Sequence, residues 1–288
     1  MSSINSPLRY PGGKGKLTEF VSHIIAINNI KNPIYCEPFC GGSGVAINLL
    51  LNKKVDKIIL NDFDTAIYSF WYAVLNDTQK MIDKINKTDI TTQERLKQKE
   101  IYMLGQTQKG YSFDLGFAAL FLNRTNVSGV IKGGVMGGES QKGKYKIDCR
   151  FNKEDIIRRI NIIAQHKESI MLHNYEAKDF IFNILQNFSN NNLFIFFDPP
   201  YYKQGKNLYT NFFSHKDHEN LGLAIKKLDE YFWILTYDNT SEILKIYKEY
   251  NPRKYKLQYS AKNKIKETEL FFSNNKTKIE SFDKVIFE

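Results

Sequence analysis

The chain has 288 residues, of which 42% are hydrophobic and 14% aromatic, so it can bury a substantial core and is not an intrinsically disordered protein. Its formal net charge of +10 favours a polyanionic partner such as nucleic acid, although a basic surface can also serve solubility alone. No apolar stretch approaches the ~18 residues of a membrane span and the N-terminus has no signal-peptide core, so we expect a cytoplasmic protein without membrane contact.

The three cysteines, Cys36, Cys40 and Cys149, form no Cys-x-x-Cys motif and no Cys/His cluster. Their odd number and their spacing argue against a disulfide framework or a zinc site, and we expect reduced, mostly buried thiols. The histidines show no metal-ligand spacing either, so no metal site is predicted.

The N-terminal segment 8–16, LRYPGGKGK, combines turn-forming glycines with the flat ring of Tyr10 and the charges of Lys14 and Lys16. Because glycine lets the backbone approach a ligand closely, the segment is a candidate binding turn. A flexible basic terminus is the alternative. Apolar residues at helical spacing predict that a helix follows from Leu17.

The next segments have the order of a nucleotide-binding unit. Residues 33–38 predict a strand, 39–44 a glycine-rich turn, 45–51 a helix and 57–60 a second strand. The second strand ends at Asp62, where a carboxylate can bind ribose hydroxyls, with Glu37 and Asp64 as secondary candidates for the same ligand. Alternatively, Asp62 caps the helix that follows.

Between residues 76 and 168 this alternation of strands and helices stops. Segments 78–104 and 116–122 are predicted to be helical, and a glycine-rich, basic segment, 129–146, follows them. Because long interruptions are usually functional or separate modules, we expect 76–168 to be a recognition domain inserted into a core formed by 1–75 and 169–288. The side chains of the glycine-rich segment suit contacts with base edges and phosphates, and the alternative is a mobile surface hairpin.

The alternation resumes with a predicted strand at 169–172 and a helix at 177–188. Residues 193–197, LFIFF, form an uninterrupted apolar run of the kind found in strands buried on both faces. The run ends in Asp198-Pro199-Pro200-Tyr201. Proline cannot continue a central strand, so these residues make a stiff turn at the carboxyl end of the strand, where α/β sheets bind ligands. Segments 232–237, 255–259 and 269–273 bring the total to about seven strands.

The Asp-Pro-Pro-Tyr turn suits chemistry on an amino group attached to a planar base. A carboxylate and a prolyl carbonyl can accept both N–H groups, which frees the nitrogen lone pair for attack, while a tyrosine ring stacks on the base. A strand-end turn with an ordinary capping Asp is the alternative.

Four motifs now stand in one order: YPGGK at 10–14, EPFCGGSG at 37–44, Asn61-Asp62 and Asp198-Pro199-Pro200-Tyr201. Together they resemble the Dam-type DNA adenine methyltransferases over nearly the whole chain. Residues 121–124 look like the DNA-reading segment of that family, and 266–270 look like the entry to its C-terminal strand. The resemblance implies an α/β, Rossmann-like S-adenosylmethionine-dependent methyltransferase fold, with an inserted, mostly helical DNA-recognition domain.

The resemblance also implies roles for individual residues. The cofactor S-adenosylmethionine would be bound by the residues that match its contacts in the family, namely Tyr10, Lys14, Asp62 and Asp198, with Tyr175 beside its adenine. The target adenine would be flipped out of double-stranded DNA, because its amino group is unreachable within the stack. It would then meet the catalytic residues Asp198, Pro199 and Tyr201. We expect DNA contacts from Arg9, Arg124 and Asn126.

Several other functions remain open. An amino-methyltransferase of this kind could act on cytosine N4, on RNA or on a protein glutamine, and a catalytically inactive DNA-binding relative would share the fold. A nicotinamide oxidoreductase would use the glycine loop and Asp62, but it gives no reason for Asp-Pro-Pro-Tyr. Residues 133–138 have no counterpart that aligns with the family, so the target sequence stays open. A cognate restriction endonuclease is a partner that the reaction does not require.

Overall fold

The computed structural model describes residues 6–9, 14–203, 213–257 and 267–288 of the chain. Tyr10 therefore lies outside the described residues, as do Lys266 and part of the strand predicted at 255–259.

Within the described residues, seven strands form a single sheet in the order β3-β2-β1-β4-β5-β7-β6. The strands are β1 Ile34–Glu37, β2 Lys57–Asn61, β3 Ile170–His173, β4 Leu193–Phe197, β5 Phe232–Asp238, β6 Arg253–Leu257 and β7 Glu267–Ser273. The first five run parallel, and β7 lies antiparallel between β5 and β6. The predicted mixed, Rossmann-like sheet is confirmed.

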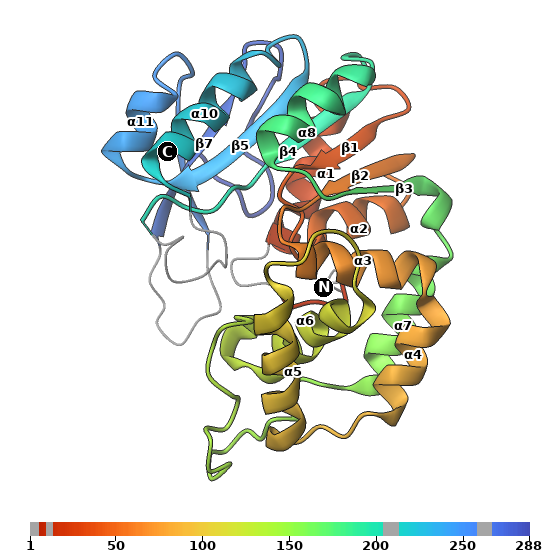
Figure 1. Ribbon diagram of the computed structural model, residues 1–288. Helices are drawn as coiled ribbons and strands as arrows, with labels where there is room; N and C mark the ends of the chain where they lie inside the picture. The colour runs from red at the N-terminus through yellow and green to blue at the C-terminus, as the bar shows by residue number, and fades with distance from the viewer. Residues whose placement is uncertain (1–5, 10–13, 204–212, 258–266) are drawn as a thin grey trace.

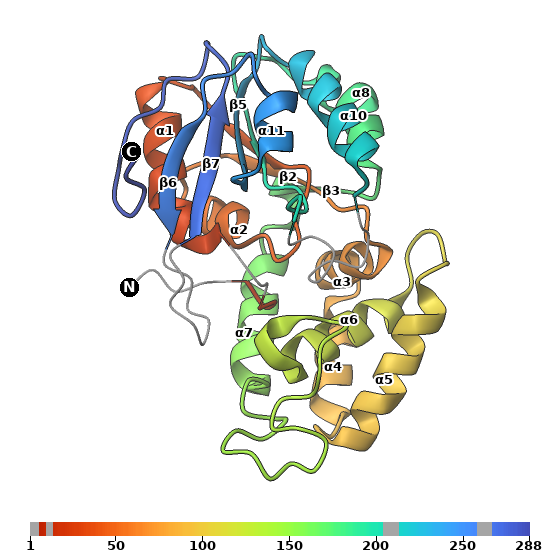
Figure 2. The same ribbon diagram turned by 90° about the vertical axis from the view of Figure 1, so that its left-hand side faces the viewer.

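Helices cover both faces of the sheet (Figures 1 and 2). One face carries α1 Thr18–Ile27, α2 Gly44–Leu51 and α3 Thr65–Asn76, and the other carries α8 Ala177–Asn183, α10 His215–Lys226 and α11 Ser241–Ile246. Alternate residues of β4 enter the two cores: Phe194 packs on the α1–α3 side and Ile195 on the α8–α11 side. This arrangement explains why β4 has no polar face, since successive side chains of a strand point to opposite sides.

Four further helices form a second lobe, the helical lobe, below the sheet in Figure 1. They are α4 Thr78–Lys87, α5 Thr92–Gly105, α6 Phe113–Thr125 and α7 Lys153–Ala164. They lie within the predicted insertion, whose bounds at 76 and 168 stay a prediction. Every residue of helix α6 except Asp114 is buried. It crosses α3 closely at Gly116, where an added Cβ would lie 2.6 Å from the carbonyl carbon of Ser69.

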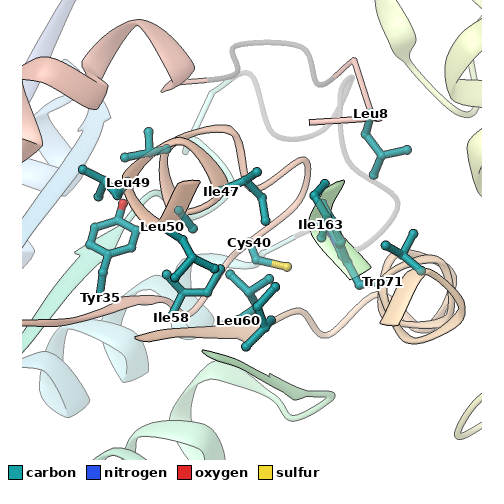
Figure 3. Packing of buried hydrophobic residues seen from close by; sticks show 14 of the residues in the cluster. Leu8, Tyr35, Cys40, Ile47, Leu49, Leu50, Ile58, Leu60, Trp71 and Ile163 are labelled. Atoms are coloured by element: carbon teal, nitrogen blue, oxygen red, sulfur yellow. The ribbon is translucent and has the colours of Figure 1, made fainter. Parts of the chain in front are cut away.

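One hydrophobic core runs from the sheet into the helical lobe. Figure 3 shows Tyr35 and Ile58 of the sheet packed near Leu50 of α2, with Trp71 of α3 and Ile163 of α7 in the same cluster. Because the apolar contacts are continuous, α3 and α7 connect the two lobes through packing as well as through the chain.

Two local predictions need correction. The helix predicted at 177–188 ends at Asn183, and a short 3-10 turn, Leu185–Asn187, follows it. The strand predicted at 255–259 begins earlier, at Arg253. The prediction of mostly buried thiols is confirmed, since Cys36 and Cys40 are buried and Cys149 is exposed. No helix in the described residues is long and apolar enough to cross a membrane.

Candidate active site

The two chemistry-bearing turns meet at the point where the strand order reverses. Strand β1 is flanked by β2 on one side and by β4 on the other. The glycine loop, Phe39–Gly44, leaves the carboxyl end of β1, and Asp198 leaves the carboxyl end of β4. In open α/β sheets, this switch point is where ligands bind. The topology therefore brings together two motifs that stand far apart in the sequence.

Asp198 is held by two groups and remains partly open, with 26% of its side chain exposed. Its Oδ1 accepts a 2.7 Å hydrogen bond from the hydroxyl of Thr236 in β5, and the ammonium of Lys14 lies 3.6 Å from the same oxygen. In the described part of the chain, no hydrogen bond engages Oδ2. Burial raises the pKa of Asp198 above its ordinary value, while Lys14 and Thr236 act in the opposite direction.

Lys14 lies buried at the start of the 3-10 turn Lys14–Leu17 and is surrounded by acceptors. Its Nζ donates to the hydroxyl of Tyr201 at 2.5 Å and to Oε2 of Glu269 in β7 at 3.0 Å. The hydroxyl of Tyr255 in β6 donates to the same carboxylate oxygen. Burial alone would lower the pKa of Lys14, but the carboxylates of Asp198 and Glu269 raise it well above its ordinary value, so Lys14 is an ammonium ion here.

The glycine loop is fixed from two sides. Asp62 accepts the Gly41 N–H at 2.8 Å through Oδ2 and the Asp64 N–H at 3.0 Å through Oδ1. The indole N–H of Trp71 donates to the Gly41 carbonyl at 2.9 Å. Asp64, and not Asp62, caps α3, because its side chain accepts from the N–H of Ala66. The capping alternative for Asp62 is therefore wrong.

Two acids beside this loop favour their protonated forms. Glu37 is buried and accepts the Tyr35 hydroxyl at 3.0 Å and the Ala46 N–H at 3.1 Å, and burial raises its pKa to about 8. Burial and then the charge of Asp64 raise the pKa of Asp62 to about 7. Because no cationic side chain in the described part of the chain forms an ion pair with Glu37 or Asp62, a positively charged ligand would stabilise their ionised forms.

Two exposed aromatic residues flank the carboxyl ends of β2 and β3. Phe63 is 54% exposed and Tyr175 is 43% exposed. The buried side chain of Asn61 accepts the Tyr175 N–H at 2.9 Å and donates to its carbonyl at 3.1 Å. Asn174 donates to the Asp62 carbonyl at 2.7 Å, so the Tyr175 turn is tied to the end of β2.

The N-terminal segment Ser6–Arg9 runs between the glycine loop and the helical lobe. At one end, the Ser6 hydroxyl donates to the carbonyl of Gly42. At the other end, the side chain of Asn123 in α6 accepts the Arg9 N–H at 2.7 Å and donates to the Arg9 carbonyl at 2.8 Å. An added Cβ on Gly129 would lie 2.0 Å from that carbonyl oxygen, so only glycine fits there.

Arginines gather around this segment. Arg124 donates to the Pro7 carbonyl at 2.6 Å, and Arg159 donates to the Ser6 carbonyl at 3.0 Å. Nη1 of Arg9 and Nη2 of Arg124 are buried and have no hydrogen-bond partner among the described residues. Burial, followed by repulsion from Arg159 and Arg9, lowers the pKa of Arg124 to about 10. Such a cluster of like charges would be stabilised by an anion.

Asn126, predicted to contact DNA, lies in the turn after α6. It is fully buried; its Oδ1 accepts from Arg95 at 2.7 Å, and its Nδ2 donates to the carbonyls of Val130 and Ile131 at 3.1 and 2.7 Å. Direct contact with DNA would break these buried bonds, so in this arrangement Asn126 supports the turn after α6. Arg124 is also buried, whereas Arg9 is only half-buried.

The glycine-rich segment after α6 is internally hydrogen-bonded. The Val127 N–H donates to the Gly134 carbonyl at 2.9 Å, and the side chain of Gln141 donates to the Met136 carbonyl at 2.7 Å while accepting the Ile147 N–H at 2.8 Å. Its exposed lysines are Lys132, Lys142, Lys144 and Lys146. The segment therefore presents positive charge on a backbone that its own bonds shape.

Sequence reasoning missed Thr236 and the role of Glu269 beside Asp198. Thr236 stands within the largely apolar strand β5, Glu269 directly precedes the apolar residues Leu270–Phe272 of β7, and both are buried. A buried polar side chain needs a partner, so a hydroxyl or carboxylate within or beside an apolar run is the signal that could have found them. Among the described residues, no group of three or more His, Cys, Asp or Glu side chains could hold a metal ion.

The sheet order and the two turns at its switch point define a Rossmann-like methyltransferase. Residues 10–260 match the D12 class N6 adenine-specific DNA methyltransferase family, and the chain belongs to that family. Its reaction is the methylation of adenine in DNA, and the predicted resemblance to DNA adenine methyltransferases is confirmed.

Individual relatives are distant. The Type II methyltransferase M.MjaIII of Methanocaldococcus jannaschii is 25% identical over an alignment of 241 residues, which covers 77% of this chain and 80% of the relative. The structure of the rRNA methyltransferase aviRa of Streptomyces viridochromogenes has a TM-score of 0.41 at 11% identity, covering 93% of this chain and 88% of the other. The structure of SMU.472 complexed with SAH has a TM-score of 0.38 at 11% identity, covering 91% and 53%.

Proposed function

We propose that this chain is a site-specific DNA methyltransferase that uses S-adenosylmethionine to methylate N6 of an adenine flipped out of double-stranded DNA. The observation that carries the proposal is the position of Asp198 at the switch point beside the glycine loop, with one oxygen fixed by Thr236 at 2.7 Å. We extend the proposal to a cytoplasmic location and to a cognate restriction endonuclease as an optional partner, because the named relative is a Type II methyltransferase.

The residues around the glycine loop fit the cofactor chemically. Glu37 and Asp62 have raised pKa values and gain from a positively charged ligand, and S-adenosylmethionine carries a sulfonium and an ammonium group. Asp62 would accept ribose hydroxyls, and the exposed rings of Phe63 and Tyr175 would flank the adenine. When bound, the cofactor supplies a methyl group activated by the sulfonium. Lys14 and Tyr10 would be further contacts of this cofactor, and Tyr10 lies outside the described residues.

The catalytic work of the protein is to orient the target amino group. Thr236 fixes Oδ1 of Asp198, which leaves Oδ2 to accept one amino hydrogen. The Pro199 carbonyl would accept the other, and the ring of Tyr201, anchored through its hydroxyl by Lys14, would stack on the base. Holding the nitrogen in a reactive geometry converts binding energy into rate. Asp198 acts in its ionised form, because the carboxylate serves as a hydrogen-bond acceptor for the amino group.

DNA would lie against the helical lobe and the N-terminal segment. The buried, unpartnered guanidinium nitrogens of Arg9 and Arg124 suit a phosphate, and the exposed lysines of the glycine-rich segment suit further phosphates. Asn126 takes a positioning role in this proposal, since its side chain is already fully used within the turn.

The experiment is expression in a host that lacks adenine methylation, followed by mapping of modified bases in its DNA by long-read sequencing. We expect N6-methyladenine within one recurring sequence, and we expect Asp198→Ala to reduce methylation by about 10²- to 10³-fold or more while the protein still folds. Methylated cytosine or RNA with unmodified adenine would contradict the proposal. Full activity in Asp198→Ala would contradict the mechanism.

A further inference from the structure

Lys14 lies between two carboxylates at unequal distances. Its Nζ is 3.0 Å from Oε2 of Glu269, within hydrogen-bond range, but 3.6 Å from Oδ1 of Asp198, beyond it. Its 2.5 Å hydrogen bond to the Tyr201 hydroxyl fixes the direction of the ammonium further. Lys14 therefore lies closer to Glu269 and Tyr201 than to Asp198, and it lowers the pKa of Asp198 mainly through its charge.

Glu269 is an unusual residue for its place in the fold. It is 2% exposed in a strand whose next residues, Leu270, Phe271 and Phe272, are apolar and buried. A buried carboxylate is costly to desolvate, and an apolar residue would serve strand packing as well or better. The Glu269 carboxylate accepts from Tyr255 and from Lys14, so its partners point toward the active site.

We propose that Glu269 is a positioning residue for methyl transfer: it holds the ammonium of Lys14 against Tyr201 and away from Asp198. This inference rests on the proposed function. If Glu269 carried no charge, Asp198 would be the strongest anion facing Lys14, and a full ion pair would form between them. That pair would compete with Thr236 for Oδ1 of Asp198 and disturb the orientation that presents Oδ2 to the target amino group. It would also draw Lys14 away from the Tyr201 hydroxyl.

The negative charge of Glu269 should also affect the pH dependence of methyl transfer. The titratable groups that face Asp198 come from several elements and are Lys14, Tyr35, Glu37, Tyr201, Tyr237 and Glu269. Among them, the negative charge of Glu269 raises the pKa of Asp198 and also that of Lys14. Glu269→Gln removes that negative charge, which lowers the pKa of Asp198. A Lys14 ammonium closer to Asp198 lowers the same pKa further. The acid limb of the pH–rate profile, which requires ionised Asp198, should therefore move to lower pH.

Two variants separate positioning from a purely structural role. Glu269→Gln removes the charge that faces Lys14, whereas the control Tyr255→Phe removes the hydrogen bond that Tyr255 donates to the same carboxylate and leaves the charge in place. We expect Glu269→Gln to lower the single-turnover rate about 10- to 100-fold and to shift the acid limb downward. Tyr255→Phe should keep the wild-type acid limb. Thermal denaturation of both variants reports any shared loss of stability.

A double-mutant cycle tests whether Glu269 acts through Lys14. Lys14→Met should slow the reaction, and adding Glu269→Gln to it should slow the reaction no further. The double variant also lacks the buried Glu269 carboxylate that Lys14→Met leaves without this cation, so it should melt at a higher temperature than Lys14→Met alone. It therefore provides a folded reference even if Glu269→Gln alone folds poorly.

The outcomes distinguish a failure of the Glu269 inference from a failure of the proposed adenine methylation. If the wild-type chain leaves adenine unmodified, the proposed function fails and the inference fails with it. If the wild type methylates adenine and Glu269→Gln matches its rate and acid limb, only the inference is overturned. Equal slowing by Glu269→Gln in the wild-type and Lys14→Met backgrounds would also overturn it, because Glu269 would then act independently of Lys14.

Discussion

Replacing Thr236 by valine removes the only side-chain donor from β5 that the described structure directs at Asp198. Valine keeps the branched shape and the strand preference of threonine, and position 236 is fully buried in β5. Backbone pairing with Phe271 of β7 does not involve the side chain and should persist. The substitution therefore tests one hydrogen bond, 2.7 Å long, to the carboxylate of Asp198.

The expected size follows from the charge on the acceptor. A hydrogen bond to an ionised group contributes about 1.5–3 kcal/mol, so losing it from the oriented carboxylate should lower kcat/KM about 10- to 100-fold. The Thr236 hydroxyl also lowers the pKa of Asp198, so its loss raises that pKa further. Because the ionised form accepts the amino hydrogen, the acid limb of the profile should move to higher pH.

The assay is single-turnover methylation of a duplex that carries the mapped recognition sequence, across the acid and alkaline limbs of the profile. Thr236→Val should shift the acid limb upward, and Glu269→Gln should shift it downward. A general loss of stability could not produce opposite shifts. If the Thr236→Val profile coincides with that of the wild type, Asp198 does not depend on this hydrogen bond and our reasoning about its orientation is wrong.

Two further predictions concern parts of the molecule away from Asp198. Gly129→Ala should lower the melting temperature and the DNA affinity, because Gly129 has a φ of +79° and an added Cβ would lie 2.0 Å from the Arg9 carbonyl oxygen. The control Gly134→Ala places its Cβ in open space and should change little. Equal melting temperatures for the two variants would contradict the prediction. His218→Gln should reduce the acid sensitivity of the fold, measured as urea unfolding at about pH 7 and about pH 5. Burial lowers the pKa of His218 from 6.5 to about 4, so the unfolded chain binds the proton first and stability falls as the pH drops through that window, by about 3 kcal/mol in full. If the wild type and His218→Gln lose the same stability between the two pH values, the acid sensitivity does not come from His218.

The central strand and its turn could be predicted because their signals are local. Five apolar residues in a row, followed by Asp198 and two prolines, allow few structures other than a buried strand that ends at once. The glycine loop and Asp62 follow their own strands in the same way. Joining these turns into one site required only the rule that parallel strands share a carboxyl edge.

The partners of Asp198 could not be predicted in the same way. Thr236 lies 38 residues further along the chain and meets Asp198 only because β5 pairs with β4. The burial of Asn126 is in part a tertiary result, since its Oδ1 accepts from Arg95 of α5, 31 residues earlier in the chain, while its Nδ2 donates to carbonyls within the turn. A polar side chain in a DNA-reading segment can face the nucleic acid or support the backbone, and residue type alone does not decide between them.

The placement of Ser6–Arg9 has a consequence for protein engineering. These residues belong by sequence to the catalytic part of the chain, yet Asn123 and Arg159 of the helical lobe hydrogen-bond to their backbone. A chimaera that exchanges residues 76–168 with those of a relative, in order to change the recognised sequence, would pair foreign helices with a native N-terminal segment. Lys14 follows Arg9 by only five residues, so a mismatch at Ser6–Arg9 would also disturb the position of Lys14. Exchanging the first nine residues together with the helical lobe should therefore preserve activity where exchanging the lobe alone does not.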